Sequence, residues 1–357
     1  MFSNNIKSFI ILNIYFLIIV DIFLIIAIYF QIIKGKIKTK LYEKALIELK
    51  PMILNFIEED DKLFDLKKSL KNDFTKNVAI DIMVDYSEEK DMDLSEKFIK
   101  LELDDYLIKK LSRRVNITYL KKLTFMRVET AYTTLLRVSE SEDLDICYMS
   151  FFALSLIKLS KEKKEIAIKK LVNSTILNDR IIEILNKFNL GIEEWVELLE
   201  KEETSKGKVI YIKNLSLKQE IKIEENSDRL LKFLTYDKEV KIATILALCN
   251  SKNEKYINQL INIYESEENW QVRVAIAKGL RNFKFEKVKG ILLIMTNDNE
   301  WWVRYNAIKS IVAMGEEGLF TLIDLSLEVK DKNISDLAYY FLNSNKDVYN
   351  TVKNIEV

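Results

Sequence analysis

Residues 299–311 read NEWWVRYNAIKSI, and the same pattern occurs twice more upstream at a nearly constant interval. Residues 268–280 read ENWQVRVAIAKGL, and residues 237–248 read DKEVKIATILAL. In each copy, a valine is followed seven residues later by a small residue and eight residues later by a large aliphatic one. These sets are Val240, Ala247 and Leu248; Val272, Gly279 and Leu280; and Val303, Ser310 and Ile311. Because residues at this spacing share one face of a helix, each copy predicts an amphipathic helix.

A second apolar pattern follows each copy in the same register and predicts a second helix. Its members are Ile257, Leu260, Ile261 and Tyr264; Val288, Ile291, Leu292 and Met295; and Leu319, Leu322, Ile323 and Ser326. Each unit of about 31 residues is therefore predicted to be a helical hairpin, with at least four units between about 226 and 345. One further period predicts core positions at Ile334, Ala338 and Leu342, although Phe341 stands where a small residue is expected. Such a period is typical of a solenoid, in which stacked units supply a continuous core.

The repeat pattern becomes weaker toward the N-terminus. DLDICYMSFFALSLI, residues 143–157, matches the first helix of a unit about three periods upstream of Val240. VIYIKNLSLKQEIKI, residues 209–223, is rich in β-branched residues and is compatible with a strand, but the period around it favours a helix. We therefore expect degenerate repeats over 126–225 and clear repeats over 226–357.

These residues resemble the short bacterial HEAT-like repeats of about 31 residues, also called phycobilisome-lyase-type HEAT repeats. The shared pattern is an acidic turn, then Val-Arg, then alanines and leucines; its motif residues here are Val272, Arg273, Asp298, Val303 and Arg304. The resemblance implies that the valines face the core and that each arginine reaches an acidic turn of the neighbouring unit. The predicted fold class is all-α, with a single N-terminal transmembrane helix followed by an α-solenoid of HEAT-like hairpins.

The N-terminus predicts a membrane anchor at 1–34. Residues 9–33 read FIILNIYFLIIVDIFLIIAIYFQII, which is 25 residues with a single charge. At about 1.5 Å per residue this run can cross a hydrocarbon core of roughly 30 Å, whereas the apolar part of a cleavable signal peptide is typically about 7–15 residues. A charged helical region, 35–125, follows it, in which Pro51 is expected to kink or restart a helix.

Charged residues in and around this run predict its orientation and its contacts. One lysine precedes it, whereas Lys34, Lys36, Lys38 and Lys40 follow it. The positive-inside bias therefore predicts a single-pass protein of the cell membrane with the bulk of the chain in the cytoplasm. The same lysines either only set this topology or also contact anionic lipid headgroups. Asp21 falls near the bilayer midplane, where a carboxylate either contacts another membrane helix or is merely tolerated.

The composition gives little support for catalysis or nucleic-acid binding. The chain has no histidine, so the usual general base and the commonest metal ligand are missing, and no P-loop or GxGxxG loop is present. Lysine and arginine total 55 and acidic residues total 55, which argues against a nucleic-acid binder. The two cysteines, Cys147 and Cys249, form no CxxC motif. We expect no catalytic residue, no metal site and no cofactor, and we do not expect an enzyme.

The tryptophans of the repeats suggest one contact residue. Trp270 and Trp301 are equivalent across repeats, which favours a role in packing. Trp302 aligns with Gln271 and Glu239, which are polar, so Trp302 is predicted to be exposed and to bind a partner.

Two classes of function follow from the sequence. In the first, the chain is a membrane-anchored cytoplasmic scaffold that binds partner proteins through its solenoid. Its layout of one span followed by HEAT-like repeats also resembles bacterial proteins found beside membrane family 2 glycosyltransferases that make exopolysaccharide. In the second, the chain is a phycobilisome-lyase-like enzyme, or another enzyme acting on a bound small molecule.

Overall fold

The computed structural model describes the backbone of residues 2–59, 62–328 and 332–344. It describes the side chains in these ranges from residue 19 onward, except at 328. Within these ranges every regular element is helical, which confirms the all-α class. The chain forms two compact units, Met1–Leu159 and Ser160–Val357. The narrower boundaries expected from the sequence, at 34, 125 and 225, stay predictions.

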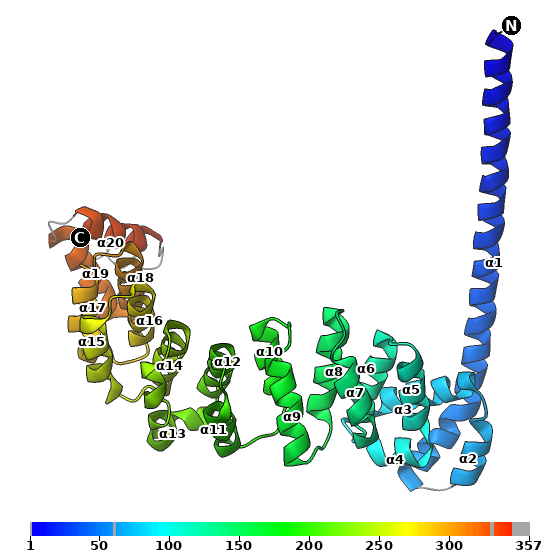
Figure 1. Ribbon diagram of the computed structural model, residues 1–357, viewed down its shortest axis with the longest axis horizontal. Helices are drawn as coiled ribbons and strands as arrows, with labels where there is room; N and C mark the ends of the chain where they lie inside the picture. Colours follow the sequence, from blue (N-terminus) through cyan, green and yellow to red (C-terminus); the bar gives the residue numbers. More distant parts are fainter. Residues whose placement is uncertain (1, 60–61, 329–331, 345–357) are drawn as a thin grey trace, which may run out of the picture. The chain divides into compact units, whose positions relative to one another are not determined.

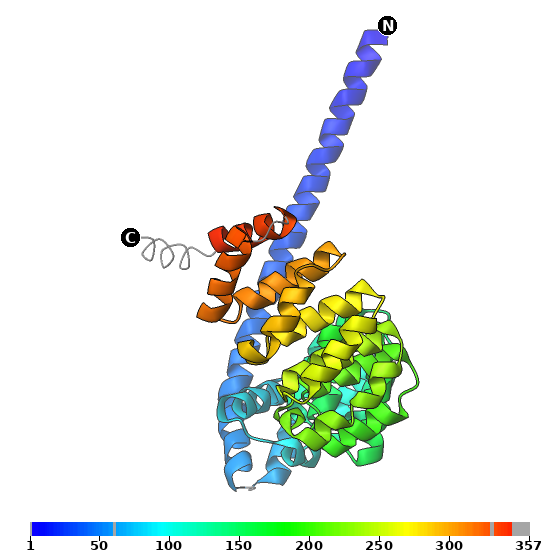
Figure 2. The ribbon, with the colours of Figure 1, turned by 90° about the vertical axis from the view of Figure 1, so that its left-hand side faces the viewer.

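The first unit contains eight α-helices among its described residues, labelled in Figure 1. They are α1 (Phe2–Glu59), α2 (Leu63–Ser69), α3 (Asp73–Lys90), α4 (Ser95–Lys100), α5 (Leu103–Arg113), α6 (Ile117–Met126), α7 (Tyr132–Val138) and α8 (Leu144–Leu156). Only the C-terminal part of α1 packs into this unit, where Leu49, Ile53 and Phe56 are buried and α1 contacts α3. Its N-terminal part extends away from the other helices of the unit (Figures 1 and 2).

Pro51 lies inside α1. Of the two expected outcomes at this residue, a kink or a restart, the restart is therefore wrong. Proline removes the hydrogen bond to the Ile47 carbonyl, but both residues lie on the exposed side of α1, where water can replace it.

Among the residues whose side chains are described, no helix is both long and apolar enough to cross a membrane. Residues 9–18 of the expected span lie outside those residues.

The second unit contains twelve α-helices in its described ranges. They are α9 (Lys161–Val172), α10 (Asn178–Leu185), α11 (Ile192–Lys201), α12 (Ser205–Ser216), α13 (Glu224–Asp228), α14 (Lys238–Ser251), α15 (Tyr256–Ser266), α16 (Trp270–Leu280), α17 (Phe285–Met295), α18 (Trp301–Val312), α19 (Glu316–Glu328) and α20 (Lys332–Ser344). We call α12, α14, α16, α18 and α20 the first helices of the repeats, and α15, α17 and α19 the second helices. Successive first helices pack against one another, and each second helix packs against its neighbouring first helices.

The repeat register predicted from the sequence is confirmed in the core. Val240, Val272 and Val303 are buried, as are the large aliphatic residues eight positions later. The strand alternative for residues 209–223 is wrong, because most of this segment lies in α12 and in a short 3₁₀ turn. In α20, Ile334 and Ala338 are buried as expected, but Phe341 is buried and Leu342 only half-buried. The large aromatic ring at position 341 thus occupies the core in place of the expected leucine.

Two of the small residues, Gly279 and Ser310, lie where neighbouring first helices are in close contact. A Cβ atom added at Gly279 of α16 would lie 2.3 Å from the Sγ atom of Cys249 in α14. Ser310 of α18 is buried, and its hydroxyl donates a hydrogen bond of 2.7 Å to the Ala277 carbonyl of α16. The requirement for small residues in the repeat pattern therefore comes from helix-to-helix distance.

Replacing Gly279 with alanine should lower the free energy of unfolding of the second unit by about 1–3 kcal/mol, because the new methyl group meets the buried Cys249 side chain. Gly290→Ala is the matched control, since this helical glycine has open space around it and gains helix propensity. Thermal unfolding of both variants measures the difference, and adding Cys249→Ala to Gly279→Ala should restore stability. A Gly279→Ala protein as stable as the wild type would show that the contact is loose.

Candidate functional site

An ion pair joins two successive repeats at the turn before α18. The Arg273 guanidinium of α16 donates two hydrogen bonds of 2.9 Å, from Nε and Nη2, to the two carboxylate oxygens of Asp298. The Tyr264 hydroxyl of α15 donates a third, of 3.1 Å, to the same carboxylate. One repeat earlier, the Lys241 ammonium lies 2.9 Å from a carboxylate oxygen of Glu267. These paired positions tie α14 and α16 to the acidic turns that precede α16 and α18.

The arginines also hold their own turns. Arg273 Nη1 donates to the carbonyls of Glu267 and Glu268, at 3.0 and 2.9 Å. Arg304 Nη1 makes the equivalent bonds to the carbonyls of Asp298 and Asn299, at 2.7 and 3.0 Å. The position one period beyond Asp298 is residue 329, which lies outside the described residues. Both arginines therefore satisfy carbonyls that precede a helix, which is a structural role.

The environment of Asp298 stabilises its charged form. Burial by itself would raise the pKa of this carboxyl, but the hydrogen bonds from Arg273 and from the backbone N–H of Glu300 outweigh it and hold the pKa below its usual range. Burial and the neighbouring Asp298 charge raise the pKa of Tyr264 to about 12. Tyr264 therefore remains a hydrogen-bond donor at physiological pH.

Asp298→Asn should destabilise the second unit by about 3 kcal/mol at pH 7, because it leaves the largely buried Arg273 charge without its partner. Since the folded-state pKa of Asp298 is lowered, its contribution is present above about pH 4 and is lost as the pH falls through the folded value. Urea unfolding from pH 7 to pH 2 should therefore show a steeper acid loss in the wild type than in the variant. Glu193→Gln is the control; it removes an exposed pair with Arg229 at 2.6 Å and should cost less than about 1 kcal/mol. Equal losses for both variants would contradict this assignment.

Aromatic side chains gather on the surface of the last two first helices. We define the aromatic surface as Trp301, Trp302 and Tyr305 of α18 with Tyr340 and Phe341 of α20. Ring centroids lie 4.6 Å apart for Trp301 and Trp302, 5.0 Å for Trp301 and Tyr305, and 5.2 Å for Tyr305 and Phe341. Trp302 is 50% exposed, whereas Phe341 is buried and anchors the cluster to the core. The surface is therefore both apolar and held in place by ring contacts.

Trp270 and Trp301 are 38% and 44% exposed, so the packing role expected from their equivalence does not place them in the core, and Trp301 packs instead against Trp302 and Tyr305. Each of the two equivalent tryptophans lies two residues before a buried valine, Val272 or Val303, and two residues correspond to about 200° around a helix. Equivalence between repeats indicated that the two tryptophans share a face, but that face lies opposite the core. Trp301 is thus a candidate contact residue that the sequence interpretation missed.

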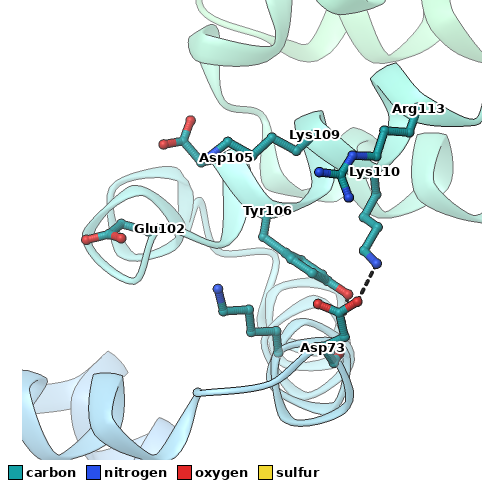
Figure 3. A pocket seen from close by; sticks show the side chains of 8 residues that line it. Asp73, Glu102, Asp105, Tyr106, Lys109, Lys110 and Arg113 are labelled. Atoms are coloured by element: carbon teal, nitrogen blue, oxygen red, sulfur yellow. Dashed lines mark hydrogen bonds and ion pairs between the residues drawn. The ribbon is translucent and has the colours of Figure 1, made fainter.

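The first unit contains a charged pocket between α3 and α5, with a volume of about 210 Å³ (Figure 3). Eight residues line it: Asp73, Lys76, Glu102, Asp105, Tyr106, Lys109, Lys110 and Arg113. No motif marked this pocket in the sequence, since its residues come from segments about 30 positions apart that look like solvated helix surface.

Several groups in the charged pocket are already engaged with one another. Lys110 forms an ion pair with Asp73, which raises the pKa of the lysine. Lys67 of α2 lies 2.8 Å from Glu102 and lowers the pKa of that carboxyl. The Tyr106 hydroxyl accepts a hydrogen bond of 2.8 Å from Asn77.

The membrane-related candidates all lie on the exposed part of α1. Asp21 is exposed, and so are Lys34, Lys36, Lys38 and Lys40. None of these five side chains forms an ion pair with any residue in the described ranges.

Both cysteines and Tyr256 are buried or hydrogen-bonded in ways that disfavour reactivity. Burial raises the pKa of the Cys249 thiol to about 12, and Cys147 is also buried. The hydroxyl of Tyr256 bonds to Asp228 and Ser227, and burial raises its pKa to about 12. Within the part of the chain that the structure describes, no group of three or more cysteine or acidic side chains is placed to hold a metal ion.

Comparison with known proteins supports the repeat assignment. A family model described as HEAT repeats matches residues 227–311 and 257–333. This region contains the hairpins from α14 to α19, so this part of the chain is built of HEAT-like repeats. No curated protein matches the chain. Among solved structures, an engineered protein is 17% identical over 86% of this chain and 95% of its own, with a TM-score of 0.35, a likeness too low to carry an argument.

Proposed function

We propose that this HEAT-like repeat chain is a membrane-anchored scaffold that binds a partner protein on the cytoplasmic side of the membrane. The aromatic surface on the repeats is the single observation that carries the binding role. The exposed apolar part of α1 supports the anchor, and the lysines that follow it support the orientation.

Residues 19–33 of α1 present apolar side chains on all sides of the helix, with Asp21 and Gln31 as the polar exceptions. Between residues 19 and 33 its large apolar side chains are all exposed: Ile19, Val20, Ile22, Phe23, Leu24, Ile25, Ile26, Ile28, Tyr29, Phe30, Ile32 and Ile33. A helix that is apolar on every side needs an apolar environment, and lipid provides one while the helix satisfies its own backbone hydrogen bonds. The continuation of this run to residue 9 in the sequence gives the length that a span requires.

The aromatic surface has the properties of a protein-binding hot spot. Tryptophan and tyrosine are enriched among residues that dominate binding energies, because they bury large areas with few rotatable bonds. Trp302 packs edge-on against Trp301, and Tyr305 contacts both rings. Since these rings already hold one another in place, they lose little conformational entropy when a partner covers them.

The proposed partner is itself a membrane protein. A scaffold tethered by one span meets partners in the same membrane at high effective concentration. Asp21 gives the span a polar group that a partner helix can satisfy inside the bilayer. By its layout, the chain resembles accessory proteins of membrane family 2 glycosyltransferases, and we take an exopolysaccharide system of this kind as the first place to look. The alternative of an enzyme, phycobilisome-lyase-like or otherwise, is not supported by the two cysteines, because both thiols are buried.

Membrane extraction tests the anchor. Alkaline carbonate should leave the full-length chain in the membrane pellet, because the apolar part of α1 is held by lipid rather than by surface charge. Protease added to intact cells should leave residues 34–357 uncut, whereas the same protease should digest them after lysis. Release by carbonate would contradict the anchor, and digestion from outside would contradict the orientation.

Substitution in the aromatic surface tests the binding role. The Trp301→Ala, Trp302→Ala double variant should lose at least about tenfold in the amount of membrane partner that co-purifies after gentle solubilisation. Its melting temperature should change little, because both side chains are about half-exposed and lie outside the buried core. Quantitative mass spectrometry of the co-purified proteins provides the measurement.

Two controls separate binding from folding. Trp270→Ala removes an exposed tryptophan at the equivalent position of the preceding repeat and should keep the partner. Ala307→Asp places a charge in the buried core and should lose both fold and partner. Undiminished capture by the double tryptophan variant would exclude the aromatic surface as the binding site.

A further inference from the structure

The charged pocket of the first unit plays no part in the proposed scaffold function. Its volume of about 210 Å³ is smaller than the roughly 300–1,000 Å³ typical of pockets for drug-sized ligands. Its lining is dominated by charged side chains from α3 and α5, with Tyr106 as the only aromatic residue among them. A pocket of this size and character suits a small, highly charged group.

The pocket carries unbalanced positive charge. Of its three carboxylates, Asp73 is paired with Lys110, and Glu102 with Lys67 from outside the pocket. Three cations of the lining, Lys76, Lys109 and Arg113, form no ion pair with any residue that the structure describes. Three unpaired cations and one unpaired carboxylate, Asp105, leave an excess of two positive charges.

The lining charges are distributed around the Tyr106 ring. Figure 3 shows Arg113 and Lys110 on one side of the ring, with Asp73 beside Lys110. Glu102 and Asp105 lie on the other side, where the Lys109 side chain extends toward Asp105. The Lys110 ammonium lies 5.6 Å from the centre of the Tyr106 ring, and the Lys76 ammonium lies 5.3 Å from it. The ring and the Lys110–Asp73 pair thus form a fixed wall, beside which the Arg113 guanidinium keeps its N–H donors free of carboxylate partners.

We propose that this pocket binds a phosphomonoester group. Such a group carries about −1.5 to −2 charges at pH 7, which matches the excess of two positive charges, whereas a single carboxylate would neutralise only half of it. Arg113 is the bidentate donor, because a guanidinium presents parallel N–H bonds that match two phosphate oxygens. Lys76 and Lys109 add positive charge to the same lining, and Asp105 opposes the anion.

Two sources can present this group to the pocket. One is a soluble phosphorylated small molecule, and the other is the phosphomonoester headgroup of phosphatidic acid. The chemistry in the pocket is the same for both. Acyl chains add an apolar part that only the lipid possesses.

The test titrates inorganic phosphate into the full-length chain in detergent solution, at constant ionic strength, by isothermal titration calorimetry. The wild type should bind at a single saturable site. Arg113→Gln should weaken this binding at least about tenfold, because it removes a charge-assisted bidentate contact. Asp105→Asn should strengthen binding, because it removes a repelling charge from the pocket.

The matched control is Lys121→Gln, which removes the same charge from the exposed surface of α6, outside the pocket, and should leave phosphate binding unchanged. Thermal unfolding by circular dichroism establishes that each variant is folded. The proposal is overturned if phosphate does not saturate a site, if folded Arg113→Gln binds it as well as the wild type, or if Lys121→Gln weakens binding equally.

Two further probes distinguish the sources in the same solution. Glycerol 3-phosphate and dihexanoyl phosphatidic acid present the same phosphomonoester group, and both should compete with inorganic phosphate. Tighter competition by the lipid assigns the pocket to a membrane headgroup, and equal or tighter competition by glycerol 3-phosphate assigns it to a soluble ligand. Failure of both to compete would contradict the proposal.

Discussion

Close packing between the first helices of successive repeats is the constraint on which the second unit depends. A single hairpin cannot cover its own apolar face, so Val240, Val272 and Val303 are buried only because the next helix lies against them. That helix can approach because the facing positions are small, at Ala247, Gly279 and Ser310. The ion pairs between repeats act at the other end of the same helices, where Arg273 joins α16 to the turn before α18. Packing thus sets the distance between neighbouring first helices, and the ion pairs fix how each of these helices aligns with the following turn.

The same constraint determines what the surface can display. Once the valine face of α18 is turned to the core, Trp301 and Trp302 must lie on its outer side, at the start of the helix. Tyr305 follows one turn later and reaches Phe341 of α20, so the outer surface is joined to the core by a chain of ring contacts. A surface built in this way is rigid, and rigidity favours specific over adaptable recognition.

The sequence predicts most of this core, because a period that returns to the same residue types identifies the buried face without any structure. It also indicated that Trp302 is exposed, since polar residues occupy its position in the sister repeats. It could not place Trp301, because equivalence between repeats does not reveal which face is shared.

Asn214 shows a second limit of what the sequence pattern can predict. It lies in α12 and is fully buried although it is polar, and neither of its amide atoms is hydrogen-bonded in the described structure. The charged pocket depends on which helices of the first unit meet, and a periodic pattern holds no information about that.

The continuity of α1 through Pro51 joins the proposed membrane-spanning segment directly to the body of the first unit. Asp21 and Ile53 belong to one uninterrupted helix. At about 100° per residue, the 32 positions between them bring the two side chains within roughly 40° of the same face. Ile53 is fully buried in the core of the first unit. The direction in which Asp21 points from the helix axis is therefore fixed relative to that core. In a membrane-embedded α1, a helix bound at Asp21 therefore approaches from the side of α1 on which the first unit is packed, and any rotation of the span turns the whole unit with it.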